Sequence, residues 1–172
     1  MNAVNGIALG LTEGATGRLL LRGDARLVTS HVRRDNLSAT SSVLCDGGTI
    51  EARADNPAFF SKLEDISFGE RGLTLDTAGY DLGIDSCVLR PVSGARAITL
   101  AGTGSLDLTG AEIRLSRDFT SCDLVVAAEG AITGVPHITN ESGRPKGACR
   151  VVISPDGKRC SIHRVGMWMT IR

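Results

Sequence analysis

The segment that most constrains the fold is residues 66–110, where short runs of alternating apolar and polar residues are interrupted by glycines at nearly regular intervals. In residues 73–76, and again in 98–100, the large aliphatic side chains are two positions apart, so they share one face of an extended chain. A strand with one apolar face must stack on copies of itself, pack on a second sheet or close into a barrel. The repetition favours stacking, so this segment predicts the strands of a solenoid.

Apolar pairs with this spacing continue toward the C-terminal part of the chain. They are Leu73 and Leu75, Leu82 and Ile84, Ile98 and Leu100, Leu106 and Leu108, Ile113 and Leu115, and Leu124 and Val126. The steps from Leu73 to Ile98, from there to Leu124 and on to Val151 are 25, 26 and 27 residues. Because these steps fall within the range of solenoid repeats, the sequence shows about three coils.

The composition indicates a single all-β domain over residues 1–172. This length suffices for one continuous core, and the 21 glycines, with β-branched residues in the alternating runs, indicate many turns. Two further strands are predicted at 42–45 and 49–52, on either side of a turn at residues 46–48. Only residues 57–66 place apolar side chains at helical spacing, so any helix is predicted to lie there.

Charge and hydropathy narrow the classes of partner. Lys plus Arg and Asp plus Glu both number 19, so the chain has no basic field that would hold a nucleic acid backbone. No span approaches the roughly 18 consecutive apolar residues of a membrane helix, and we expect no membrane insertion. The first residues lack the basic and apolar regions of a secretory signal. We therefore expect either a cytosolic protein or an excised part of a longer chain.

The cysteines indicate neither a zinc site nor a complete disulfide framework, because they are odd in number and form no CxxC pair. We expect buried free thiols at all five positions. These positions are Cys45, Cys87, Cys122, Cys149 and Cys160.

A hairpin is predicted around Asp156-Gly157 as its two-residue loop. In that register Cys160 faces Ile153 and Cys149 faces Arg164, so the hairpin does not bring these two thiols together.

We expect residues 149–172 to cap the solenoid. A solenoid ends in an open sheet edge and an exposed apolar cross-section, which recruit further chains unless they are covered. The hairpin has one apolar face, and Met167-Trp168-Met169 adds an indole and two adaptable thioethers. The prediction places Trp168 or its Met neighbours over the end of the core.

Two segments resemble the coils of a known bacterial family, the autotransporter-associated β-strand repeat proteins. Residues 72–79, GLTLDTAG, resemble the family's G-x-(I/L)-D-T-x-G coil, with one more residue between the first glycine and the aspartate. Residues 100–110, LAGTGSLDLTG, resemble its K-x-G-x-G-x-L-x-L-x-G coil, with Leu100 in place of the lysine. The two occur in the family's order, and residues 130–134 and 151–157 loosely resemble its closing coil and hairpin. The family's Asn-Thr-Tyr-Thr-Gly is absent after Gly110.

The resemblance implies a right-handed parallel β-helix with a C-terminal capping hairpin, forming the C-terminal part of a secreted passenger. The glycines of the two segments are predicted to take positive φ at the turns between strands. A phosphate-binding loop at residues 102–104 is disfavoured, because no Lys-Ser/Thr follows and no helical pattern begins there. The predicted turn glycines are Gly72, Gly79, Gly102, Gly104 and Gly110.

No set of residues amounts to an active site, so we predict no catalytic, cofactor-binding or metal-ligating residues and no cofactor. Asp76, Asp81 and Asp85 could offer oxygen ligands to calcium, but they also fit solvated positions between inward side chains. The tripeptide Arg22-Gly23-Asp24 matches an integrin-type motif, for which chance occurrence is the favoured interpretation. The three histidines, His31, His137 and His163, are expected to be exposed to solvent.

Two classes of function remain. The first is a non-catalytic extracellular or cell-surface passenger module that mediates adhesion or acts as a spacer, with a glycan or a protein as its ligand. The second is a carbohydrate-active β-helix enzyme, such as a pectinase-like hydrolase or lyase, for which Asp76 and Asp107 would have to approach one another. The chain has only six aromatic residues for sugar stacking, and a fold alone does not confer activity, so we favour the module.

Overall fold

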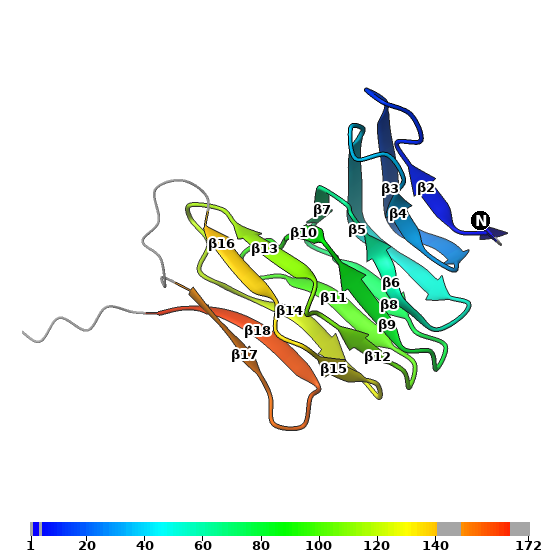
Figure 1. Ribbon diagram of the computed structural model, residues 1–172. Helices are drawn as coiled ribbons and strands as arrows, with labels where there is room; N and C mark the ends of the chain where they lie inside the picture. Colours follow the sequence, from blue (N-terminus) through cyan, green and yellow to red (C-terminus); the bar gives the residue numbers. More distant parts are fainter. Residues whose placement is uncertain (1, 4, 141–148, 166–172) are drawn as a thin grey trace, which may run out of the picture.

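The structure is a computed structural model and describes residues 2–3, 5–140 and 149–165. Strands make up 61% of the described residues, and they stack as a β-solenoid of about six turns. Successive turns lie side by side from the N-terminal end to the C-terminal hairpin (Figure 1). The prediction of an all-β parallel β-helix with a C-terminal hairpin is confirmed.

Each complete turn contributes three strands, which form three parallel ladders. The long strands β3 and β5 each cross a corner, because the first half of β5 pairs with β7 and its second half pairs with β8. The first face contains the first halves of β3 (Thr16–Thr29) and β5 (Thr40–Ala52), then β7 (Asp65–Phe68), β10 (Cys87–Arg90), β13 (Ala111–Leu115) and β16 (His137–Asn140).

The other two faces continue the same turns. The second face contains β1 (Asn2–Ala3), the second halves of β3 and β5, β8 (Leu73–Asp76), β11 (Arg96–Ala101), β14 (Ser121–Ala127), β18 (Arg159–Arg164) and β17 (Cys149–Ile153). The third face contains β2 (Ile7–Leu9), β4 (Val32–Arg34), β6 (Asn56–Ser61), β9 (Leu82–Asp85), β12 (Ser105–Asp107) and β15 (Ala131–Thr133).

The core consists of aliphatic columns that run along the stack. On the second face, Ile50 pairs with Leu75 and Leu75 pairs with Leu100, and all three are fully buried. Each such side chain contributes about 1.5–3 kcal/mol by leaving water. The alternation read from the sequence thus becomes one continuous core, because inward positions of successive turns fall directly on one another.

The predicted coil steps are confirmed at the first position only. Leu73 pairs with Ile98, as expected from a step of 25 residues. Ile98 pairs with Val125 rather than Leu124, because the pairing of β11 with β14 runs without a shift from Arg96–Asp123 to Leu100–Ala127. Leu124 and Val125 are both buried, at the point where the pairing of β14 with β18 is irregular. The last step is wrong, since Val151 lies in the antiparallel hairpin and pairs with Ile162.

The helix suggested at residues 57–66 is wrong, because this segment forms β6 and β7. Phe59, Leu63 and Ile66 are buried as their spacing suggested. They reach the core from two different strands, since the chain turns a corner at Lys62, which has a positive φ of 57°. The predicted turn at residues 46–48 is likewise a bend inside the continuous strand β5.

The five predicted turn glycines are required for two different reasons. Gly72, Gly79 and Gly102 have positive φ, as predicted. Gly104 and Gly110 do not, so for them the prediction of positive φ is wrong. A Cβ at position 104 would lie 1.8 Å from the Tyr80 oxygen of the preceding turn, so this position is glycine because the two backbones nearly touch.

The C-terminal hairpin has the predicted register. Cys160 pairs with Ile153 and Cys149 pairs with Arg164, and β18 runs antiparallel to β14 of the last complete turn. The Lys158 ammonium donates to the carbonyls of Glu129 and Gly130, which ties the hairpin loop to that turn. The hairpin therefore covers the edge of the second face. Residues 167–169, including Trp168, lie outside the described residues.

All five cysteines are buried thiols, as predicted. Burial raises the pKa of the Cys45, Cys87 and Cys122 thiols to about 12. They are therefore protonated at neutral pH and fill the core as small apolar groups. No helix in the described part of the chain has the length and apolar character needed to cross a membrane.

We predict that Gly104→Ala destabilises the protein by about 3 kcal/mol, because the new methyl group must displace the backbone of Tyr80. Gly94→Ala is the matched control, since Gly94 has a φ of 78° but no neighbouring atom within 4 Å of the added Cβ. It should cost about 1 kcal/mol, from backbone conformation alone. Urea unfolding of both variants measures the difference, and equal losses would refute the steric role of Gly104.

We predict that removing residues 157–172, which takes away β18, makes the protein aggregate. The deletion leaves β14 as an open edge with unpaired N–H and C=O groups and uncovers Val125. Truncation after residue 165 keeps both hairpin strands and is the control. Size-exclusion chromatography reports the outcome, and a monomeric shorter variant with unchanged thermal stability would contradict the capping role.

Candidate functional site

Asp76 and Asp107, the two carboxylates considered for a carbohydrate-active enzyme, lie on different faces of the stack. Asp76 ends β8 on the second face, where it is in register with Glu51 and Ala101. Asp107 ends β12 on the third face, where it is in register with Thr133. Each caps the turn that follows its strand: Asp76 accepts from the Ala78 N–H at 3.0 Å, and Asp107 accepts from the N–H and hydroxyl of Thr109.

The carboxylates considered for calcium are engaged with the protein itself. Asp81 accepts from the N–H and the hydroxyl of Ser105 in the next turn, and these bonds hold the pKa of its carboxyl below the ordinary value. Asp85 accepts from the hydroxyls of Ser61 and Ser86. Within the described ranges, His, Cys, Asp and Glu form no group of three or more suited to a metal ion.

The integrin-type tripeptide lies at the first corner of the stack. Arg22 and Asp24 are both exposed, and a bulge between Gly23 and Arg26 separates the two halves of β3. Arg22 is nevertheless in register with Asp46 of β5, so the motif begins inside a paired strand and not at the tip of a protruding loop.

Of the three histidines, His137 and His163 are exposed as predicted. His31 is only partly exposed, which the sequence did not predict. It stands just before β4, and its ring packs against Gly6, where a Cβ would lie 2.3 Å from the ring atoms. The Ser30 hydroxyl lies 3.2 Å from its Nδ1.

His31 lines a polar cavity, which we name the bulge pocket. The pocket encloses about 210 Å³ between the second and third turns of the stack. Its lining combines cationic and polar side chains from β4, from β6 and from the residues that flank them. These residues are His31, Arg33, Arg34, Asp35, Asn56, Ala58, Ser61 and Lys62.

A bulge in β6 creates this pocket. Asn56 pairs with Leu82 and Phe60 with Ile84, so four steps along β6 are matched by two along β9. The Asn56 side chain holds the bulge: its Oδ1 accepts from the Ala58 N–H at 2.9 Å and its Nδ2 donates to the Ser30 oxygen at 3.0 Å. The bulged backbone can fit because residue 83 is glycine, where a Cβ would lie 2.2 Å from the Pro57 oxygen.

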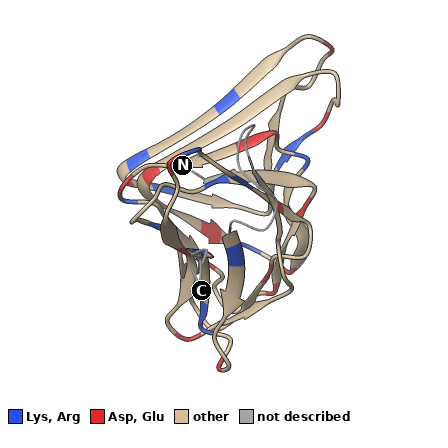
Figure 2. Ribbon diagram, turned by 90° about the vertical axis from the view of Figure 1, so that its left-hand side faces the viewer, with Lys and Arg blue, Asp and Glu red and all other residues tan. Residues whose placement is uncertain are grey.

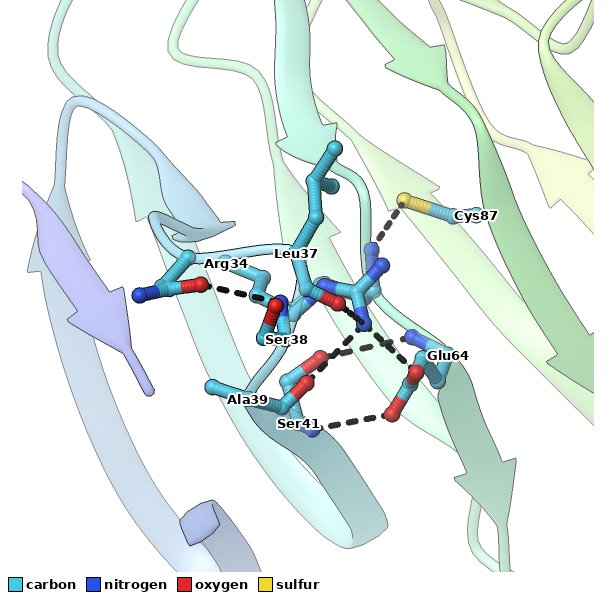
Figure 3. Close-up of polar contacts among 9 residues, drawn as sticks. Arg34, Leu37, Ser38, Ala39, Ser41, Glu64 and Cys87 are labelled. Atoms are coloured by element: carbon cyan, nitrogen blue, oxygen red, sulfur yellow. Dashed lines mark hydrogen bonds and ion pairs between the residues drawn. The ribbon is translucent and has the colours of Figure 1, made fainter. Parts of the chain in front are cut away.

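An anchored guanidinium forms part of the pocket wall. The Arg34 side chain is only 11% exposed, and its Nη1 donates to the Ala39 oxygen at 3.0 Å and to Glu64 Oε1 at 2.5 Å (Figure 3). Glu64 in turn accepts from the Ser41 N–H, and its own N–H donates to the Ser41 hydroxyl. These contacts fix the guanidinium at the corner between β4 and β7. Its Nε is buried without a hydrogen-bond partner.

The electrostatics of the pocket keep His31 neutral at pH 7. Burial lowers its pKa below the ordinary value of 6.5, and the Arg33 charge lowers it further, while Asp35 partly opposes both. Three permanent cations, Arg33, Arg34 and Lys62, line the pocket beside the single carboxylate of Asp35. A neutral imidazole and fixed cations can bind polar or anionic groups.

Two other cavities have fewer charged side chains in their linings. One encloses about 340 Å³ beside Cys122, Asp123 and His163, but the raised pKa of the Cys122 thiol makes it a poor nucleophile. The other encloses about 310 Å³ beside Glu112 and His137. Glu112 there is already held by the Thr139 hydroxyl and by Arg114.

Sequence reasoning missed the bulge pocket. The signal that could have found it is the departure of residues 56–58 from the regular coil, where Asn-Pro interrupts an otherwise apolar strand. His31 lies 25 residues and Arg33 lies 23 residues before Asn56, where the bulge begins, so only the stacking of turns brings them to it.

Comparison of the chain with protein-family models, with curated proteins and with solved structures finds no match.

We predict that stability falls as the pH drops below 6.5, because the unfolded chain then binds a proton at His31 while the folded protein resists it. The loss stops once the pH passes below the folded pKa. His31→Gln should remove this component of the pH dependence. His137→Gln, at an exposed position, is the control and should retain it. Urea unfolding between pH 5 and 8 tests this, and an unchanged slope in His31→Gln would refute it.

Proposed function

We propose that this chain is a non-catalytic extracellular or cell-surface module, whose stacked turns serve as an adhesive surface or as a spacer. A parallel stack of this kind is elongated and bends little, because every turn is hydrogen-bonded to the next along three ladders. The resemblance of residues 72–79 and 100–110 to autotransporter-associated repeats supports placing the module in a longer secreted chain.

The observation that carries the proposal is the use of outward charges to bind one turn to the next. On the first face, Arg90 Nε lies 3.5 Å from Asp65 Oδ1 of the preceding turn. Glu112 accepts from the Thr139 hydroxyl of the next turn at 2.6 Å and from Arg114 of its own strand at 2.8 Å, and these bonds lower the pKa of its carboxyl. Such groups are committed to holding the scaffold together, whereas catalytic carboxylates face a bound substrate.

The second candidate, a carbohydrate-active enzyme, draws its support from the fold alone. Hydrolysis of a glycosidic bond requires two carboxyl groups roughly 5–10 Å apart on either side of the substrate. Asp76 and Asp107 stand on different faces and cap separate turns. The geometry therefore favours binding or spacing over glycan cleavage. The distribution of charge also favours binding or spacing, because acidic and basic residues are interspersed along the ribbon (Figure 2).

Glycan-array binding of the purified protein, run beside a reducing-end assay on pectin and related polysaccharides, tests this proposal. We expect binding, or no binding in the case of a pure spacer, and no release of reducing ends. Asp76→Asn and Asp107→Asn serve as matched variants. Release of reducing ends that either variant abolishes would establish the enzyme and overturn the module.

A further inference from the structure

We propose that the bulge pocket binds a small oxyanion, either free or carried as the carboxylate or sulfate of a sugar. This inference goes beyond the role of the module as adhesin or spacer, and it stands on the pocket whether or not the chain is secreted. Its basis is a cavity that the regular coil does not need, built by an irregular strand and lined by fixed cations.

The cationic side chains of the pocket differ in how many hydrogen bonds and ion pairs they already make with protein groups. Arg34 is turned toward Glu64 and the Ala39 oxygen, so it acts as a fixed charge in the wall. Arg33 uses its Nε in an ion pair with Asp35 at 2.5 Å, and its side chain is still 50% exposed. Lys62 is exposed, and its ammonium has no ion-pair partner among the described residues. Arg33 and Lys62 are therefore the groups that can reach a ligand.

Nearby carboxylates do not cancel this arrangement. Glu64 is already engaged, because it accepts hydrogen bonds from the Arg34 guanidinium and from the Ser41 N–H. Asp85 stands in the neighbouring turn, where it accepts from the hydroxyls of Ser61 and Ser86. Asp35 alone lines the cavity as an acid, and it orients Arg33 through their ion pair.

The backbone presents Lys62 in a fixed direction. Its N–H donates to the Asp85 oxygen at 2.8 Å, and its φ of 57° places it in the left-handed region. That conformation costs a lysine about 1 kcal/mol or more, and it turns the chain at the pocket rim. The His31 ring packs against the backbone of Gly6, where a Cβ would leave no room for it. A ligand thus meets a site whose walls are set before it binds.

The size of the pocket fits a single anionic group. Its 210 Å³ is smaller than the roughly 300–1,000 Å³ of pockets for drug-sized ligands. The space suits a tetrahedral or planar oxyanion with part of one sugar ring. Guanidinium and ammonium groups bind such oxyanions through charge-assisted hydrogen bonds, which are stronger than neutral ones.

Isothermal titration calorimetry of the full chain at low salt tests the proposal with four probes: inorganic sulfate, glucose 6-sulfate, glucuronate and glucose. We expect saturable binding of at least one anion and none of glucose. Tighter binding of the sugar anions than of sulfate assigns the site to an anionic sugar, and the reverse assigns it to the free ion. Binding of glucose as tight as that of glucuronate would overturn the proposal, as would the absence of binding by all four.

Matched variants locate the site. Lys62→Asn keeps a residue that tolerates positive φ and removes the ammonium, and Arg33→Gln removes the other exposed cation of the pocket. Each should weaken anion binding about tenfold or more, the loss of one charge-assisted hydrogen bond. Arg53→Gln removes an exposed cation outside the pocket lining and should leave the affinity unchanged. Equal affinity in all three variants, with unchanged circular dichroism, would show that the anion binds elsewhere and would refute the site.

Discussion

The architecture depends on backbone hydrogen bonds between successive turns, which hold equivalent residues about 4.8 Å apart along the stack. These bonds continue through the corners: the Gly47 N–H donates to the Gly72 oxygen, and the Thr77 N–H donates to the Ala101 oxygen. Corners packed this closely leave no space for some side chains, which is why position 104 carries no Cβ beneath Tyr80. The buried Thr77 hydroxyl completes the corner, since it accepts from Gly104 and donates to Ala101.

The same constraint governs the outer surface. A residue at one outward position lies next to its equivalents in the turns before and after, so opposite charges or hydroxyls in a column stabilise the stack and like charges would oppose it. Asp81 with Ser105 and Asp65 with Arg90 follow this rule. Side chains that are available to bind a ligand must lie where these columns are interrupted, and the bulge of β6 interrupts them. It pushes Pro57 and Ala58 out of register and leaves the cavity in which the cations gather.

The regular part of this fold could be predicted from sequence, because alternation and coil spacing are local signals. Leu73, Leu75, Ile98 and Leu100 take their predicted places, and so does the hairpin, whose register depends only on its loop. The errors fall where an irregularity shifts the pattern. In β14 the adjacent residues Leu124 and Val125 are both buried, which breaks the expected alternation, and the corner at Lys62 imitates helical spacing. The pocket could not be predicted from the sequence for the same reason, since it lies between β4 and a bulge in the next turn.

The end of the stack follows from the geometry of pairing. Adding another parallel strand to β14 requires a further coil of about 25 residues, whereas an antiparallel hairpin needs only its own two strands and a short loop. The hairpin supplies β18 to the edge of β14, and its loop carbonyls at Gly157 and Lys158 accept from the N–H groups of Ile132 and Ala127. One local element thus satisfies the backbone of the second face and also reaches β15 on the third. Reversing strand direction ends the parallel register at β18, so the ladder cannot simply repeat the preceding coil.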